Sequence, residues 1–308
     1  MNVSEHDRTS GAGFSGAVGL VLARPARLLG IEPFFMEFIA GIEERLAERG
    51  LSVLLHVVAT QEAEIDAYRR WAAQGLVDTV VVVNRTVDDK RLPVLRELGL
   101  PAVLVGAGSD DADGTDAAAG GGGPAMPAVR TDDAGPVREA LAHLLDLGHR
   151  RIARVSGPAN LLHTRARTAA LVEGCRAVGV EPVVVEGDYS DEAGAKLTTA
   201  LLRRPEPPTA ILYDNDVMAV AGLGAAKEMG VAVPERLSLI AWDDSTLCRL
   251  ASPPLTTMSV DVHQYGVLVA ESVLELIDGR PVAERWSPTA RCVPRGSTAP
   301  CAVPSTTV

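Results

Sequence analysis

The sequence predicts an α/β protein whose two similar lobes, each with its own parallel sheet, have a ligand cleft between them. Apolar runs of strand length alternate with segments of helical periodicity, which is typical of parallel sheets with right-handed crossovers. The alternation occupies residues 17–105 and begins again after residue 128. The chain of 308 residues is also large for one compact domain.

The first set of elements begins with a buried strand at residues 17–22. The helix that follows has apolar residues at helical spacing and ends at Gly50. Its apolar positions are Phe35, Phe38, Ile39, Ile42 and Leu46. The other elements expected in this set are strands at 51–58, 77–83 and 101–105 and helices at 62–74 and 92–98.

A segment rich in Gly, Ala and Asp interrupts the alternation at residues 106–127. Its composition predicts a flexible insertion. Its acidic residues lack the ordered spacing and the distal Glu of a calcium-binding loop. We therefore expect a solvated linker and no metal site.

The second set of elements begins with a helix at residues 135–147. The elements expected after it are strands at 152–155, 183–185, 210–213 and 237–241 and helices at 164–178, 192–202 and 217–229. A further helix at 262–277 has Tyr265 and three aliphatic residues on one face, and a last strand is expected at 290–293.

These elements predict the following division of the chain. The first lobe comprises residues 16–148 and 261–283, and the second comprises residues 149–260 and 284–297. Residues 1–15 and 298–308 are predicted to be a disordered lead-in and tail.

The composition argues against several classes of protein. The formal net charge of -11 does not suit strong DNA binding by this chain alone, because phosphate neutralisation dominates such binding. The four cysteines include no C-x-x-C pair, so no zinc or redox site is expected. Without a secretion signal or a membrane-spanning apolar run, the chain is expected to be soluble and cytoplasmic, with no membrane contact.

No catalytic residue and no cofactor is predicted. His149 has no evident nucleophile as a partner and is interpreted as a hinge or packing residue. Gly106 and Gly108 lack the third glycine that a dinucleotide site needs at a helix start.

Two adjacent carboxylates, Asp243 and Asp244, follow the apolar strand at 237–241 and Trp242. In open α/β sheets ligands bind beyond the carboxyl ends of strands, so Asp243 is a candidate ligand-binding residue. Asp244 is expected to cap a helix that starts near Ser245. Trp242 and Phe34 are expected to flank the cleft, whereas Phe35 is expected in the core.

An ordered series of short motifs resembles the effector-binding region of the LacI/GalR family of bacterial transcription regulators. The motifs include Pro33-Phe34-Phe35, Leu147-Gly148-His149-Arg150-Arg151, Asn215-Asp216-Val217-Met218-Ala219, Val233-Pro234-Glu235, Asp243-Asp244 and Pro254-Leu255-Thr256-Thr257. The resemblance covers about residues 16–297. It implies the type I periplasmic-binding-protein-like fold, a homodimer, and a sugar, sugar derivative or nucleoside as the small-molecule effector.

The resemblance also implies site residues. Arg167 matches a ligand-contacting arginine, Asn215 and Asp216 match a pair at a strand end, and Asp243 matches the ligand-binding carboxylate. Asp132, with the adjacent Asp133, matches a pair before the Leu-Gly-His helix. The predicted ligand-binding residues are thus Phe34, Asp132, Arg167, Asn215, Asp216, Trp242 and Asp243.

The chain departs from the family pattern in the cleft and at its start. Residues 24–31 lengthen a cleft loop, and Glu32 and Val260 stand where small or polar residues are common, which leaves the effector open. About 15 residues precede the sensor region, too few for a helix-turn-helix headpiece that binds operator DNA. The sequence therefore leaves two hypotheses, a ligand-sensing regulator and a stand-alone sugar-binding protein. An enzyme lacks any supporting motif.

Overall fold

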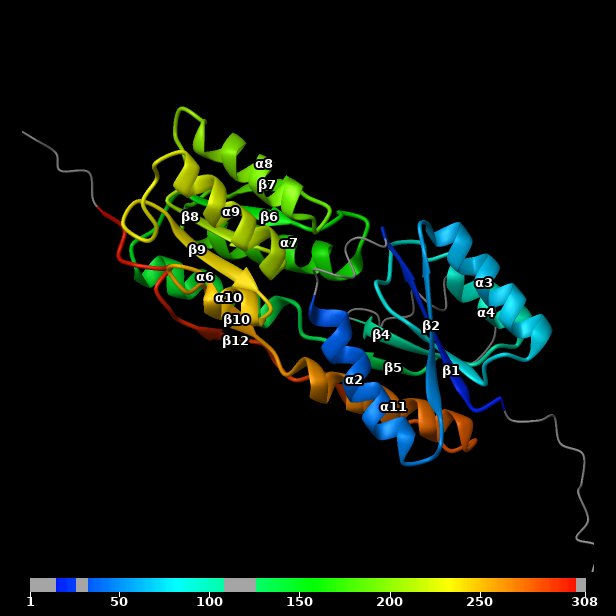
Figure 1. The fold of residues 1–308 in the computed structure, drawn as a ribbon. Coiled ribbons are helices and arrows are strands. Elements are labelled where there is room, and N and C mark those ends of the chain that lie inside the picture. The colour runs from blue at the N-terminus through cyan, green and yellow to red at the C-terminus, as the bar shows by residue number, and fades with distance from the viewer. Residues whose placement is uncertain (1–14, 26–32, 108–125, 303–308) are drawn as a thin grey trace, which may run out of the picture.

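The computed structural model describes residues 15–25, 33–107 and 126–302. In these ranges the chain forms two α/β lobes, each built on a six-stranded sheet (Figure 1). The predicted fold class is confirmed. The lead-in up to residue 14, Glu32, residues 108–125 of the expected insertion and the tail from residue 303 lie outside the described residues.

The sheet of the first lobe is parallel throughout, with the strand order β11-β5-β4-β3-β1-β2. Its strands are β1 (Ala17–Ala23), β2 (Ser52–Val58), β3 (Thr79–Val82), β4 (Ala102–Ala107), β5 (Ala128–Arg130) and β11 (Arg285–Trp286). Successive side chains of β1 point to opposite faces. Leu20 and Leu22 pack toward α2 (Pro33–Ala47) and α11 (Val262–Ile277). Val21 packs toward α3 (Gln61–Gln74) and α4 (Arg91–Leu98).

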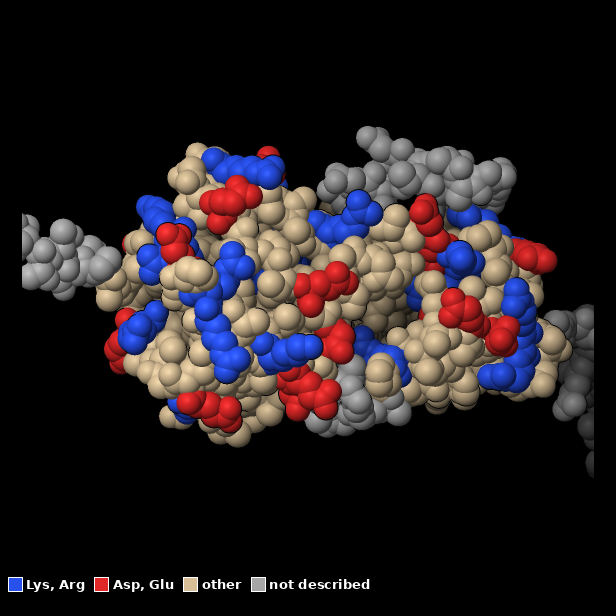
Figure 2. Space-filling view, turned by 90° about the horizontal axis from the view of Figure 1, so that it is seen from above, with Lys and Arg blue, Asp and Glu red and all other residues tan. Residues whose placement is uncertain are grey.

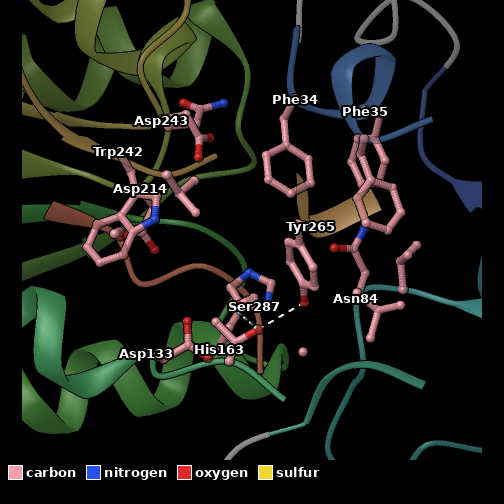
Figure 3. Close-up of a pocket in the computed structure, with 18 of the residues that line it drawn as sticks. Phe34, Phe35, Asn84, Asp133, His163, Asp214, Trp242, Asp243, Tyr265 and Ser287 are labelled. Carbon is pink, nitrogen blue, oxygen red and sulfur yellow. Dashed lines mark hydrogen bonds between the residues drawn. The ribbon is translucent and has the colours of Figure 1, made fainter. Parts of the chain in front are cut away.

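Two glycines let α2 and α11 approach closely. A Cβ atom on Gly41 would lie 2.0 Å from the carbonyl oxygen of His263, and one on Gly266 would lie 2.1 Å from that of Phe38. Any side chain there would push the helices apart. The close contact holds α2 against α11, and Phe34, near the start of α2, projects toward the second lobe (Figure 3).

The sheet of the second lobe has the order β12-β10-β9-β8-β6-β7, and only the pairing of β12 with β10 is antiparallel. Its strands are β6 (Ile152–Ser156), β7 (Val183–Glu186), β8 (Ala210–Tyr213), β9 (Ser238–Trp242), β10 (Thr256–Ser259) and β12 (Arg291–Val293). One face is covered by α6 (Ala134–Asp146) and α7 (Leu162–Ala177), and the other by α8 (Asp191–Leu202) and α9 (Asp216–Glu228). The short helix α10 (Thr246–Leu250) follows β9.

The chain changes lobes at positions that differ from the predicted boundaries. Helix α6, expected in the first lobe, packs its residues Val137 and Leu144 with Ile152 of the second. Strand β11, expected in the second lobe, pairs with β5 of the first. The spacing of apolar residues predicts whether a segment is a helix or a strand. It does not predict which of the two sheets the apolar face of α6 packs against.

The end of the described chain is ordered against the second lobe. The Thr298 hydroxyl lies 2.9 Å from that of Thr256, and the Cys301 amide donates to the carbonyl of Leu147 at 2.7 Å. The prediction that the disordered tail begins at residue 298 was therefore wrong for residues 298–302. Polar contacts hold this segment, and an apolar sequence pattern does not reveal such contacts. Within the described residues, no helix has the length and apolarity needed to cross a membrane.

Candidate functional site: a pocket between the lobes

A cavity of about 140 Å³ lies where the carboxyl ends of strands from both sheets face each other (Figure 3). The first lobe contributes residues that follow β1, β3 and β5, residues near the end of β4, and the start of α2. The second lobe contributes residues that follow β7, β8 and β9 and one face of α7. The arrangement follows the rule that ligands bind beyond the carboxyl ends of parallel strands.

Aromatic side chains are concentrated in this pocket. Of the eleven aromatic residues in the chain (four Phe, four Tyr and three Trp), six line it. They are Phe34, Phe35, Phe38, Tyr189, Trp242 and Tyr265. Phe35 and Phe38 belong to the first-lobe core, whereas the ring of Phe34 projects into the pocket. The pocket therefore offers ring faces on which an apolar ligand surface can stack.

Arg167 occupies the second-lobe side of the pocket in a fixed position. Its guanidinium carbon lies 3.9 Å from the ring centroid of Trp242, and its Nε donates to Asp133 Oδ1 at 3.0 Å. Burial disfavours its charge, but the carboxylates of Asp133 and Asp214 outweigh burial and raise the pKa of Arg167. A charged group locked between an aromatic face and a carboxylate can orient a ligand without rearranging.

Asp243 reaches the pocket from the end of β9. Burial, with a further contribution from nearby Asp216, raises the pKa of Asp243 to about 8, although Arg167 opposes the shift. The side chain is therefore mainly protonated at neutral pH and can donate a hydrogen bond as well as accept one. The backbone of Asp243 is left-handed, with φ of 67°, which non-glycine residues rarely adopt. Such strain is often found at functional sites.

The residues around the end of β8 mainly hold the site together. Asp214 accepts two hydrogen bonds from Arg154, at 2.8 and 2.6 Å, and both side chains are fully buried. Asn215 caps α9 by accepting from the Met218 amide at 2.9 Å. Asn215 lines the pocket, but Asp216 does not.

The structure thus assembles six of the seven predicted site residues. Asp216 is the exception, because its carboxylate is buried at the first turn of α9 and accepts from the Val217 amide. Asp132 lines the pocket while its Oδ1 accepts from the Ala134 and Gly135 amides at the start of α6.

Comparison with known proteins places the chain in a family. The sequence model of the periplasmic binding protein-like domain matches residues 141–298. The transcriptional regulator AglR of Rhizobium meliloti is 32% identical over 92% of this chain and 78% of its own length. The repressor CytR of Escherichia coli is 31% identical over 80% of this chain and 69% of its own. The chain belongs to the LacI family of transcriptional regulators.

Solved structures agree with this assignment of the LacI-family chain. A LacI family regulator from Bifidobacterium animalis shares 34% identity, covers 94% of this chain and all of its own, and has a TM-score of 0.82. A complex of the regulator CelR with cellobiose shares 26% identity over 92% of this chain and 85% of its own, with a TM-score of 0.80. The chain is therefore the effector-binding region of a LacI-family regulator.

The prediction from sequence missed several residues that line the pocket. They are Arg24, Asn84, His163, Tyr189 and Tyr265, while Asp133 was matched to a family pair but not selected as a ligand-binding residue. Arg24 and Asn84 directly follow strands, so the strand-end rule that selected Asp243 would have selected them too. His163 precedes Arg167 by four residues on α7 and therefore shares its face. Burial lowers the pKa of His163 to about 3, so this ring is neutral.

Two other expectations for this LacI-family chain have clear outcomes. Asp244 does not cap α10; Ser245 does so by accepting from the Leu247 amide. Asp244 accepts instead from Arg295 at 2.8 Å and ties the loop after β9 to the segment after β12. His149 is buried in the second lobe, where its ring bonds to Thr209. Among the described residues, no group of three or more His, Cys, Asp or Glu side chains could hold a metal ion.

Backbone hydrogen bonds join the two lobes beside the pocket. The Val87 amide donates to the carbonyl of Asn160 at 3.0 Å, and the Leu162 amide donates to the carbonyl of Arg85 at 2.9 Å. These bonds flank an isolated antiparallel bridge between residues 86 and 161. We refer to residues 85–87 and 160–162 as the interlobe bridge. The bridge holds the lobes together across the cleft.

Proposed function

We propose that the interlobe pocket binds a sugar, a sugar derivative or a nucleoside, and that binding changes the affinity of the regulator for operator DNA. The observation that carries the proposal is that an aromatic ring and a carboxyl group face each other across the cleft. The ring of Phe34 faces the cleft from the first lobe, and the buried carboxyl group of Asp243, whose pKa burial raises, faces it from the second. A sugar ring or nucleoside offers an apolar face for stacking and hydroxyl groups for hydrogen bonding.

The predicted residues take distinct roles in this proposal. Phe34 and Trp242 provide ring faces, and Asp243 and Arg167 bond to ligand hydroxyls. Asn215 contributes less, because its Oδ1 accepts from the Met218 amide and its Nδ2 donates to the Tyr189 carbonyl at 3.0 Å. The cellobiose bound to the related CelR supports a sugar as the effector.

Coupling to DNA requires that the effector bind two conformations of the regulator unequally. Ligands that contact both lobes favour the closed arrangement, because an open cleft separates the contacts. The operator is bound through a helix-turn-helix headpiece in this proposal, and the regulator acts in the cytoplasm.

The regulator is further proposed to act as a homodimer. Large apolar side chains are exposed on both lobes, as an interface between copies requires. Met36 and the edge-strand residues Leu54 and Leu55 lie on the first lobe, and Leu250 of α10, with 79% of its surface exposed, lies on the second. In sedimentation experiments Leu250→Glu is expected to weaken the dimer. Val178→Glu, at the exposed C-cap of α7, is the control and should leave it unchanged.

A thermal-shift screen with two variants of Asp243 tests the pocket. Because Asp243 is mainly protonated, Asp243→Asn should preserve sugar or nucleoside binding at pH 7, whereas Asp243→Ala should abolish most of the ligand-induced stabilisation. Asparagine also tolerates the left-handed backbone at this position. A ligand at a hundred times its Kd stabilises the wild type by about 2.7 kcal/mol. Equal stabilisation of the wild type and the Ala variant would reject the assigned pocket.

A further inference from the structure

A second cavity, of about 370 Å³, opens beside the first and is also lined by both lobes. The two cavities share Arg24, Val83, Asn84 and Tyr189 as lining residues, so they are neighbouring chambers of one cleft. We call the first the aromatic chamber and the second the polar chamber. The space-filling view shows the surface hollowed between the lobes (Figure 2).

The polar chamber differs from its neighbour in chemistry. Tyr189 is its only aromatic residue among the described lining residues. Polar side chains come from the start of α3, from the end of β3 and from two second-lobe loops. They include Thr60, Gln61, Asn84, Thr86, Asn160 and Asp188. This lining suits a group that makes many hydrogen bonds and has little apolar surface to stack.

The charged side chains that line the polar chamber balance, with Arg24 and Arg91 against Glu64 and Asp188, and the most deeply buried of them are already paired. Arg91 donates to Glu64 at 2.9 Å and to Asp89 at 2.6 Å, and all three side chains are at most 3% exposed. An ionic ligand would have to compete with these short, buried bonds. The chamber therefore suits a neutral group.

Hydrogen-bonding groups from both lobes remain available to that neutral group. Gln61 uses its Nε2 to donate to Thr86 Oγ1 at 3.3 Å, which leaves its Oε1 free to accept from an occupant. Asn160 lies in the opposite lobe with an exposed side chain, and only its backbone carbonyl is used, in the interlobe bridge. An occupant would contact both lobes next to the bridge that holds them together.

We propose that the effector spans both chambers, with one ring in the aromatic chamber and a second, neutral, hydroxylated unit in the polar chamber. A disaccharide or a glycoside with a sugar in each chamber has this chemistry, whereas a monosaccharide fills only one chamber. This inference rests on the proposed function of the pocket and specifies the size and composition of its ligand.

Calorimetric titration with matched pairs of sugars tests the inference. The probes are glucose with cellobiose and galactose with lactose, and adenosine and cytidine test the nucleoside alternative of the proposed function. At least one disaccharide is expected to bind about tenfold or more tightly than its monosaccharide, a difference of about 1.4 kcal/mol. If the two sugars of each pair bind with equal affinity, no second unit binds in the polar chamber, and the proposed function is unaffected. If none of these probes binds, both the sugar or nucleoside proposal and this inference fail.

Substitutions in the polar chamber locate the second unit. Ala59 lines the chamber and is exposed, so Ala59→Phe fills space without removing a bond. It should weaken the disaccharide about tenfold and leave the monosaccharide unchanged, and Ala59→Ser is the matched control. Asn160→Ala, in the opposite lobe, keeps the backbone bridge and should weaken the disaccharide severalfold. Equal losses for both sugars, or no loss with either variant, would overturn the inference.

Discussion

The two walls of the aromatic chamber are built differently, although the two lobes share one architecture. The first-lobe wall is made of aromatic rings that pack on one another, with the centroids of Phe34 and Phe38 6.0 Å apart. The second-lobe wall adds buried charges held in pairs, such as Asp214 paired with the buried Arg154, to the rings of Tyr189 and Trp242. An apolar wall favours binding through the area it removes from water, whereas fixed charges orient the ligand. The first-lobe wall therefore contributes mainly apolar area, and the second-lobe wall adds the fixed charges that orient the ligand.

The largest effect is expected where the charged wall loses one partner. Asp214→Ala leaves the guanidinium of Arg154 fully buried without its counter-charge. Breaking such a pair costs about 3–5 kcal/mol, which urea denaturation would measure as a lower unfolding free energy. The double variant Arg154→Met with Asp214→Leu should recover most of the loss, because it buries no charge. A single variant within about 1 kcal/mol of the wild type would contradict this account of the wall.

The pH dependence of stability should separate Asp243 from the paired charges. Its folded pKa of about 8 lies above that of an unfolded aspartate, so its contribution to stability is complete below about pH 4. That contribution is lost as the pH rises toward 8. Relative to Asp243→Asn, the wild type should therefore lose at least about 1.4 kcal/mol between pH 4 and 8, the equivalent of one pKa unit. Parallel urea denaturation profiles of the two proteins across this range would show that the carboxyl group is not perturbed.

The apolar wall should respond in ligand affinity more than in stability. Phe34→Ala removes the ring that projects into the pocket, and an aromatic contact contributes about 0.5–1.5 kcal/mol beyond its buried area. The sugar that binds the wild type should then bind about tenfold more weakly in calorimetric titration. Met36→Ala, on the same helix but 60% exposed and outside the pocket lining, is the control. If the Phe34→Ala protein and the wild type bind the sugar with similar affinities, the ligand does not stack on Phe34.

The fold was largely predictable because each strand and helix has its own local pattern. The Gly50 end of the first helix and the apolar run at 17–22 both correspond to the observed elements α2 and β1. The membership of α6 in the second lobe was not predictable in this way. Its apolar stripe is equally suited to either sheet, and only packing against Ile152 decides between them.

The candidate site was predictable where a residue type and its position both pointed to the cleft. Asp243 follows a strand and matches a family motif, and it lines the pocket. Asp132 and Asp133 are adjacent and alike, so sequence could not tell that Asp133 binds Arg167 while Asp132 holds the start of α6. The surrounding tertiary structure decides which role each aspartate takes. It also decides the charge of His163, because burial lowers the pKa of this ring and keeps it neutral.

The smallest effect is expected at the interlobe bridge, where the two walls are held together. Leu162 is the first residue of α7, and Leu161 before it has the extended backbone that proline requires of its predecessor. Leu162→Pro therefore removes the amide that donates to Arg85 together with the leucine side chain. Losing one such bond costs about 0.5–1.5 kcal/mol, so sugar affinity should fall up to about tenfold and X-ray scattering should show a more open molecule. Leu162→Ala keeps the amide and is the matched control; if both variants bind equally, the amide bond does not hold the walls together.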